Sequence, residues 1–329
     1  MEHPFAPFIR MLGKGQHGSR DLSQAEAEQS MSMVLNDQVE PIQLGAFLML
    51  MRIKEETAEE VAGFVQACRK AIGLPYGFPQ VSLDWASYAG KRRQLPWYVL
   101  SALLLSSPER RVLMHGLDGG IEDRVFVPQA LTALGLQPSK TLPDAASSLQ
   151  SLGFAFVPLE TLNAELYRII NLKPLLGLRS PVHTIARMLN PAAAPASIMG
   201  IFHPGYDEVH QQASQLLGDA GVAVFKGEGG EAEINPDTAT LVRLAHNGAL
   251  SQEEWPAQFA TRHMKDSEMD VTRLAQLWRG EIDDEYGAAA VIGTAAVALR
   301  ALGEATAPEE ALQQARALWQ ARDKNRFNV

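Results

Sequence analysis

A run of three cations stands in the sequence SYAGKRRQLPWY, residues 87–98. Lys91, Arg92 and Arg93 follow Gly90, and the apolar run that comes next favours a helix. A turn before a helix is a common place for phosphate, because the helix N-terminus adds partial positive charge to that of the side chains. The turn is therefore a candidate site for a small phosphorylated ligand or for a larger polyanion. The alternative is a solvated surface loop, which is the usual role of a short run of charges.

Aromatic residues flank these cations on both sides. Aromatic rings beside a basic groove can stack on bases of a single-stranded nucleic acid. Aromatic rings next to an apolar helix are also common core or interface residues. We expect Tyr88 to be the most exposed of the four, which are Trp85, Tyr88, Trp97 and Tyr98.

Composition limits the kinds of partner. The chain has 329 residues and a net charge of −9, so a polyanion site must be a local basic patch within an acidic surface. Its one cysteine, Cys68, cannot form an internal disulfide and fits a small core residue in a reducing compartment. We recognise no signal peptide, and the apolar stretch 286–303 is too interrupted for a membrane span. We expect a cytoplasmic protein without a membrane partner, in which 286–303 is a buried helix.

The first 72 residues predict helices throughout. Ser23 and Thr57 each precede a glutamate by three residues, which is the pattern of a helix-capping box. The segment 41–54 is apolar nearly all round, so it lies inside the domain or against a partner. Two glycines and two prolines in 73–80 interrupt the helical pattern and predict a hinge.

From residue 81 to 329 the pattern changes, and short apolar runs alternate with helical segments. This alternation predicts an α/β domain with a mostly parallel central sheet and helices on both faces. The strands that we expect are VSLDWAS, RVLMHG, FAFVPL, ASIMGIF and VAVFKG, with helices near 95–106, 122–135, 162–190 and 206–218 and a helical tail from about 267.

Several of these segments resemble the anthranilate phosphoribosyltransferase family, which has a class II nucleoside phosphorylase-like fold. RVLMHG resembles the strand that ends in the family's Lys-His-Gly-Asn, and 177–191 (GLRSPVHTIARMLNP) resembles its Gly-x-Arg-Thr…Asn-Pro helix. ASIMGIFHPGY resembles the strand that follows. The resemblance implies a helical N-terminal domain that dimerises and an α/β domain that holds the substrates.

The chain departs from the family where the family binds phosphoribosyl pyrophosphate. The Gly-Thr-Gly-Gly-Asp loop is replaced by SYAGKRRQ, and the lysine before His-Gly is Met114. The Asn and Arg that follow His-Gly in the family are Leu117 and Asp118 here. The acidic pair that holds magnesium aligns loosely with two glutamates, Glu231 and Glu233. In its cationic turn the chain is more similar to the diverged YbiB-type branch, which is associated with nucleic-acid binding.

We therefore predict a non-catalytic, phosphoribosyltransferase-like homodimer. We expect it to bind single- or double-stranded nucleic acid with little sequence preference, since no base-reading motif is visible and phosphate contacts would dominate. We expect no cofactor. The resemblance implies that cations from the turn, the N-terminal domain and the 168–190 helices surround one cleft. The residues expected to bind the polyanion are Lys91, Arg92, Arg93, Lys14, Arg20 and Arg179.

Two alternatives stay open. The first is a glycosyltransferase that uses phosphoribosyl pyrophosphate and magnesium. Glu231 or Glu233 would then lie near the metal, and Gly90, His115, Gly116 and Arg179 would bind the substrates. The second is a structural or regulatory dimer with a protein partner, whose mark would be a broad apolar patch.

Overall fold

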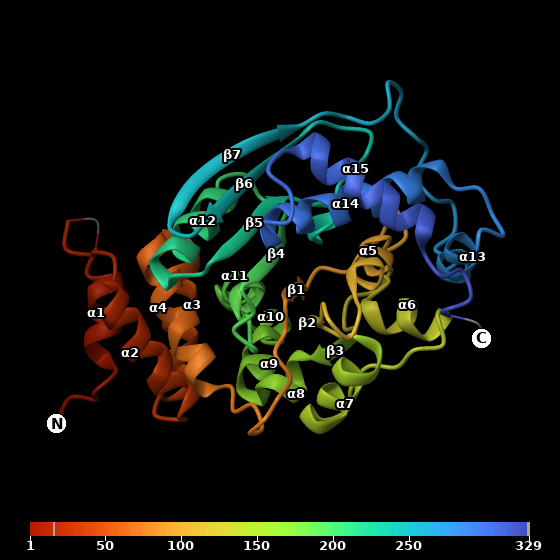
Figure 1. Cartoon of the computed structure of the whole chain (residues 1–329). Coiled ribbons are helices and arrows are strands. Elements are labelled where there is room, and N and C mark those ends of the chain that lie inside the picture. The colour runs from red at the N-terminus through yellow and green to blue at the C-terminus, as the bar shows by residue number, and fades with distance from the viewer. Residues whose placement is uncertain (16, 328–329) are drawn as a thin grey trace.

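The computed structural model describes residues 1–15 and 17–327. Four helices form one end of the molecule (Figure 1): α1 (Ala6–Gly13), α2 (Gln24–Leu35), α3 (Pro41–Lys54) and α4 (Ala58–Ala71). The predicted capping boxes begin α2 and α4, where Ser23 and Thr57 accept the backbone N–H of Glu26 and Glu60. The Glu60 carboxylate also accepts the N–H of Leu22, at 2.8 Å, and so fixes the chain that enters α2.

The remainder of the chain is built on one seven-stranded sheet in the order β3-β2-β1-β4-β5-β6-β7. The first five strands are parallel, and β6 and β7 are antiparallel. The predicted fold class, a helical N-terminal domain with a mostly parallel α/β domain, is confirmed. The strands are β1 (Leu83–Ser87), β2 (Val112–Gly116), β3 (Phe154–Pro158), β4 (Ala196–Ile201), β5 (Gly221–Lys226), β6 (Thr240–His246) and β7 (Ala249–Trp255).

The hairpin of β6 and β7 was not among the predicted elements. Its two-residue turn is Asn247-Gly248, with φ of 48° and 81°. Positive φ at both positions matches the twist of a tight hairpin, and Asn-Gly is the dipeptide that adopts it most readily. The sequence signal was therefore present between two runs of strand-forming residues.

Helices cover both faces of the sheet, and each face has its own apolar core. Successive residues of one strand face opposite cores, as Leu113 and Met114 of β2 do. The helices of this part are α5 (Tyr98–Leu105), α6 (Val127–Ala133), α7 (Leu142–Leu152), α8 (Leu159–Leu162), α9 (Ala164–Ile170), α10 (Lys173–Leu176), α11 (Val182–Ile185), α12 (Tyr206–Leu217), α13 (Thr272–Arg279), α14 (Glu285–Leu302) and α15 (Pro308–Ala321).

Helix α14 is long and apolar enough to cross a membrane, but most of it is buried within the protein. It contacts α5, α15 and β4, so it is a core helix, as the sequence predicts. The helices predicted over 162–190 are present as the short α9, α10 and α11, and α10 and α11 are separate because Gly177 takes a left-handed conformation and Pro181 begins a new turn.

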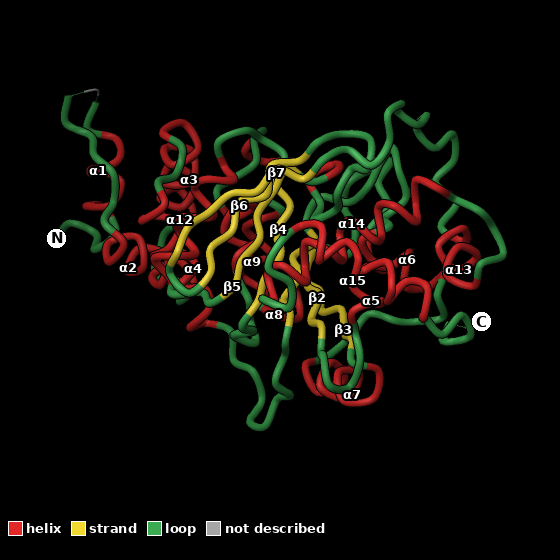
Figure 2. The backbone as a smooth tube through the Cα atoms, turned by 45° about the horizontal axis from the view of Figure 1, so that its top comes forward, coloured by secondary structure: helices red, strands yellow, loops and turns green. Residues whose placement is uncertain are grey.

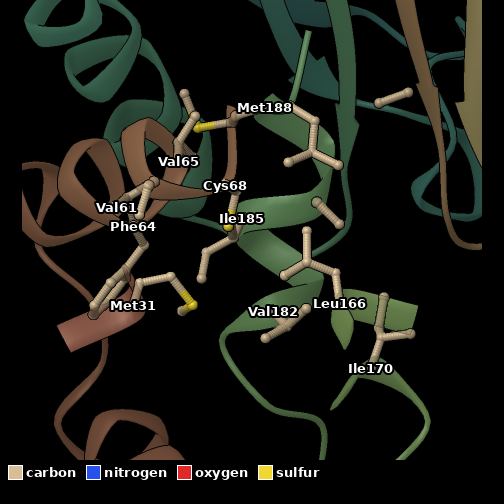
Figure 3. Packing of buried hydrophobic residues seen from close by; sticks show 14 of the residues in the cluster. Met31, Val61, Phe64, Val65, Cys68, Leu166, Ile170, Val182, Ile185 and Met188 are labelled. Atoms are coloured by element: carbon tan, nitrogen blue, oxygen red, sulfur yellow. The ribbon is translucent and has the colours of Figure 1, made fainter. Parts of the chain in front are cut away.

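The N-terminal helices share their core with the α/β part. Figure 3 shows Cys68 of α4 beside Ile185 of α11, with Phe64 next to Met31 in the same cluster, all of them buried. The Arg69 guanidinium strengthens this junction, since it donates to both oxygens of Asp219 at 2.7 and 3.0 Å. This packing places α4 against α11 and Met188, within the segment 179–188 that lines the pocket described below.

Candidate functional site

In the cationic turn, residues 87–98, the side chain of Lys91 forms a buried ion pair with Glu233. Lys91 is 1% exposed, and its Nζ lies 2.5 Å from Oε1 of Glu233 and 3.3 Å from the carbonyl of Glu228. A buried ammonium requires such a partner, because an unpaired charge in the interior is strongly destabilising. Lys91, predicted to bind a polyanion, is therefore a buried and paired residue that does not reach the surface in this structure.

Glu231 holds the same turn through its backbone. Its Oε1 accepts the N–H groups of Ala89 and Gly90 at 2.7 and 2.5 Å. Burial raises the pKa of Glu231, while these two donors and the nearby Arg187 act in the opposite direction. The other carboxylate oxygen, Oε2, is buried and has no hydrogen-bond partner among the described residues.

Glu233 is occupied on both oxygens. Besides Lys91, it accepts the backbone N–H of Tyr98 at 2.8 Å, at the start of α5. Burial raises the pKa of Glu233 to about 7, and the Lys91 charge acts against this rise. Three of the four carboxylate oxygens of these two glutamates are thus committed to protein donors, and Oε2 of Glu231 is the exception among the described residues. Across residues 1–15 and 17–327, no group of three or more acidic, histidine or cysteine side chains is arranged to hold a metal. The residues do not fit magnesium at this position.

Hydrogen bonds from Arg124 and Val125 fix the opposite side of the turn. Arg124 donates to the carbonyls of Ala89 and Gly90 at 2.8 and 3.0 Å, and the backbones of Lys91 and Val125 pair in both directions. Gly90 has a φ of +66°, and a Cβ there would lie 2.9 Å from the ring of Phe126. Only glycine fits this position. Gly90 therefore serves close packing within the turn.

The aromatic residues around the turn belong to the core. Trp85, Tyr88, Trp97 and Tyr98 are all buried, so none presents a face for a base. Tyr88, expected to be the most exposed of the four, is only 2% exposed against 0–1% for the others, and its hydroxyl hydrogen-bonds to Nδ1 of His115 at 2.7 Å. The rings pack in the core with the apolar residues on either side, and core packing is the commoner role of aromatic residues at such positions.

His115 and Gly116, the substrate-binding candidates of the glycosyltransferase alternative, end β2 in the interior. His115 is fully buried, with Nε2 3.3 Å from Oδ1 of Asp84. A Cβ at Gly116 would lie 1.7 Å from the carbonyl oxygen of Ser87, so this strand end requires glycine. The two residues support the strand ends beside the turn.

The other predicted cations differ in availability. Arg92 and Arg93 are exposed, and their side chains have no hydrogen bond or salt bridge within the part of the chain that the structure describes. Arg20 is exposed but paired with both oxygens of Glu26, at 2.6 and 2.8 Å. Lys14 is exposed in the same loop after α1, which lies at the outer edge of the helical end, away from β1 (Figures 1 and 2). The prediction that Lys14 and Arg20 surround one cleft with the turn is wrong.

Arg179 lies in a pocket between the helical end and the α/β part. Arg52 and Glu56 reach the pocket from the end of α3 and the loop before α4. A neighbouring hollow shares Arg179 and His183 and adds Lys173. The residues that line the first pocket are Arg52, Glu56, Arg179, Ser180, His183, Thr184, Arg187, Ile201, Phe202, His203, Tyr206 and His210.

This pocket carries an excess of positive charge. Arg179 is half-buried and makes no hydrogen bond or salt bridge to any described residue; burial, Arg124 and Arg52 lower the pKa of its guanidinium. Arg187 is half-buried and donates to backbone carbonyls, of Gly200 at 3.0 Å and of His183. Burial, Arg187 and Arg179 lower the pKa of His183 to about 3, so its imidazole is neutral near pH 7.

The one carboxylate in the pocket lining, that of Glu56, does not neutralise these arginines. It accepts the hydroxyl of Tyr206 at 3.1 Å, and burial raises its pKa. Two further lining groups, Ser180 Oγ and His210 Nε2, are buried without a partner among the described residues. Uncompensated guanidinium groups and unused polar atoms suit a ligand that has an anionic group and hydrogen-bonding atoms.

Arg52, Arg124 and Arg187 were not predicted from the sequence. Arg187 stands eight residues after Arg179 and four after His183, a spacing that places side chains on one face of a helical segment. That spacing could have grouped Arg179, His183 and Arg187 as neighbours. Arg52 carried no such signal, because only the fold brings the end of α3 to the pocket that segment 179–188 lines.

Comparison with known proteins agrees with this architecture. Residues 6–72 match the helical bundle domain of a glycosyl transferase family, and residues 101–321 match its a/b domain. An uncharacterized protein of Aquifex aeolicus is 30% identical over 312 residues, covering 92% of this chain and 94% of the relative. An anthranilate phosphoribosyltransferase of Methylococcus capsulatus is 27% identical over 276 residues, covering 82% and 80%.

Solved structures have the same fold. Anthranilate phosphoribosyltransferase from Thermus thermophilus superposes with a TM-score of 0.79 at 20% identity, covering 97% of this chain and 94% of the other. The enzyme from Saccharomyces cerevisiae in complex with PRPP and Mg gives a TM-score of 0.74 at 15% identity, covering 96% and 93%.

Proposed function

Because the chain belongs to the glycosyl transferase family with a helical bundle and an a/b domain, we propose that it is a phosphoribosyltransferase-like protein that binds a small anionic ligand beside Arg179. The observation that carries the proposal is the Arg179 guanidinium, half-buried and unpaired among the described residues. A desolvated guanidinium binds a carboxylate or phosphate strongly, often in a bidentate manner.

The names of the relatives suggest the ligand. Several curated relatives, among them the Methylococcus capsulatus protein, are anthranilate phosphoribosyltransferases. Anthranilate is an aromatic carboxylate with an amino group, which matches a pocket of guanidinium groups and polar atoms beside Phe202. This supports the transferase alternative for the acceptor more than for the diphosphate, since Glu231 and Glu233 are already paired with the turn.

The test is isothermal titration calorimetry of anthranilate with the wild-type protein and with Arg179→Ala. We expect binding to the wild type and a loss of about tenfold or more in affinity for the variant. Arg92→Ala is the matched control and should bind like the wild type. A wild-type protein that binds no anthranilate, or an Arg179→Ala variant of equal affinity, contradicts the proposal. The same samples with phosphoribosyl pyrophosphate, with and without magnesium, show whether transfer occurs.

A second candidate is nucleic-acid binding, which the resemblance to the YbiB-type branch suggests. The observation that favours it is the pair Arg92 and Arg93, exposed and without partners in the described structure. Each phosphate that they neutralise would release counterions, so binding would weaken steeply with salt. Fluorescence anisotropy with a labelled single-stranded oligonucleotide tests this proposal. Affinity should fall in an Arg92→Ala/Arg93→Ala variant and stay unchanged in Arg20→Ala, whose guanidinium is already paired with Glu26. Equal affinity of the double variant removes the turn from this role.

We also propose that the protein is a homodimer through α3. Leu44, Phe47 and Met51 of this helix are buried, whereas Ile42 and Ile53 on its other side are 82% and 79% exposed. A second copy of the same apolar stripe would cover them. Light scattering should show a dimer for the wild type and a monomer for Ile42→Asp/Ile53→Asp. Leu175→Asp, at an equally exposed position of α10, is the control. A wild-type monomer contradicts the dimer.

A further inference from the structure

The turn at 89–91 contains an anion that the protein supplies itself. Successive backbone N–H groups, those of Ala89 and Gly90, converge on Oε1 of Glu231 at 2.7 and 2.5 Å. Convergent backbone N–H groups in a turn are an arrangement that binds phosphate oxygens. In this protein the position of such an oxygen is filled by a carboxylate that lies 142 residues away from Ala89 in the chain.

A cation that the protein supplies lies in the same turn. The ammonium of Lys91 contacts a carboxylate oxygen of Glu233 and the carbonyl oxygen of Glu228. Carboxylate and carbonyl oxygens are also the ligands that hard divalent cations prefer.

We propose that this turn is a phosphate-and-cation site that the protein keeps filled with its own groups, with Glu231 in the anion position and Lys91 in the cation position. The Glu231 carboxylate shields the two N–H groups from an external anion. The Lys91 ammonium excludes a divalent cation from Glu233. The wild-type turn therefore binds neither phosphate nor metal, and removal of either internal ion opens the corresponding position.

The buried surroundings support this assignment. Oε2 of Glu231 makes no hydrogen bond to a described residue, although the half-buried Arg187 is close enough to lower the carboxylate's pKa. The anion position is thus surrounded by positive charge and by N–H donors, and it would retain both without the carboxylate. The inference does not rest on anthranilate binding at Arg179, so either proposal can fail while the other stands.

The first experiment opens the anion position. Glu231→Ala is titrated with inorganic phosphate and with inorganic diphosphate by calorimetry at constant ionic strength. We expect an affinity gain of about tenfold or more over the wild type, which should bind neither anion in the turn. Glu228→Ala is the matched control, since it removes a neighbouring carboxylate that does not contact these N–H groups and should gain nothing. Binding at the Arg179 pocket would be common to all three proteins and is separated by adding Arg179→Ala to each.

The second experiment opens the cation position. Manganese binding is followed by electron paramagnetic resonance at pH 8, with the wild type, Lys91→Ala and the control Arg92→Ala. We expect bound manganese in Lys91→Ala alone. A wild type that binds manganese as well as Lys91→Ala does, or a Glu231→Ala variant that gains no phosphate affinity, overturns the proposal. If one variant does not fold, the other decides.

Discussion

Positive charge is neutralised at Lys91 in the cationic turn, whereas within the described residues it is left unpaired at Arg179 in the arginine-lined pocket. In the turn, Lys91 is neutralised by Glu233, and the backbone donors are satisfied by Glu231. In the pocket, Arg179 has no partner among the described residues. The turn is the more conspicuous of the two in the sequence, yet the isolated arginine is the better placed to bind a ligand. The partner carboxylate, which lies far away in the chain, decides whether a cation is structural or available.

The largest effect should come from breaking the internal ion pair. Lys91→Met leaves a buried carboxylate at Glu233 without its partner, so we expect the free energy of unfolding to fall by about 3–5 kcal/mol. Denaturant unfolding monitored by circular dichroism measures this. Arg92→Met should change stability by no more than about 0.5 kcal/mol, because Arg92 is exposed. Equal effects of the two substitutions would erase the distinction between the neighbouring cations.

A smaller loss should follow from Gly90→Ala. The added Cβ meets the ring of Phe126, and the φ of +66° is unfavourable for alanine, so we expect a cost of about 1–3 kcal/mol. Gly119→Ala is the control, since a Cβ there has no neighbour within 4 Å. The same denaturant experiment compares the two variants. A Gly90→Ala variant as stable as Gly119→Ala would show that the turn is not closely packed.

Protonation of His183, which lines the pocket, should make the stability of the protein depend on pH. The pKa of His183 is lowered to about 3, whereas an unfolded histidine has a pKa of about 6.5. The folded state therefore resists protonation: the contribution of His183 is complete above about pH 6.5 and is lost as pH falls toward about 3. Between these pH values, the free energy of unfolding of His183→Gln should fall less on acidification than that of the wild type. Parallel curves would contradict a buried, neutral imidazole.

The smallest effect on stability should be that of Arg179→Ala. Because Arg179 gains no internal partner and is repelled by Arg52 and Arg124, its removal should change stability by no more than about 0.5 kcal/mol, in either direction. Thermal unfolding at low and high salt checks this, and any stabilisation should be greater at low salt. A loss comparable to that of Lys91→Met would mean that Arg179 is structural.

The sequence predicted the elements better than the site. Alternation of apolar runs with helical patterns is local, so β1 to β5 and the core role of α14 could be predicted from it. The hairpin of β6 and β7 was missed although Asn247-Gly248 is a strong hairpin signal. The fate of Lys91 could not be predicted, because its partner Glu233 stands 142 residues later and only the fold brings the two together.

The most direct test of the contrast between turn and pocket is a crystal structure after a bromide soak, with anomalous scattering used to locate the halide ions. Bromide is a simple anion that reports where unneutralised positive charge is accessible. The account predicts a bromide peak beside the Arg179 guanidinium and none at the N–H groups of Ala89 and Gly90. A peak at those N–H groups, or an Arg179 side chain found paired with a carboxylate and without bromide, would contradict it.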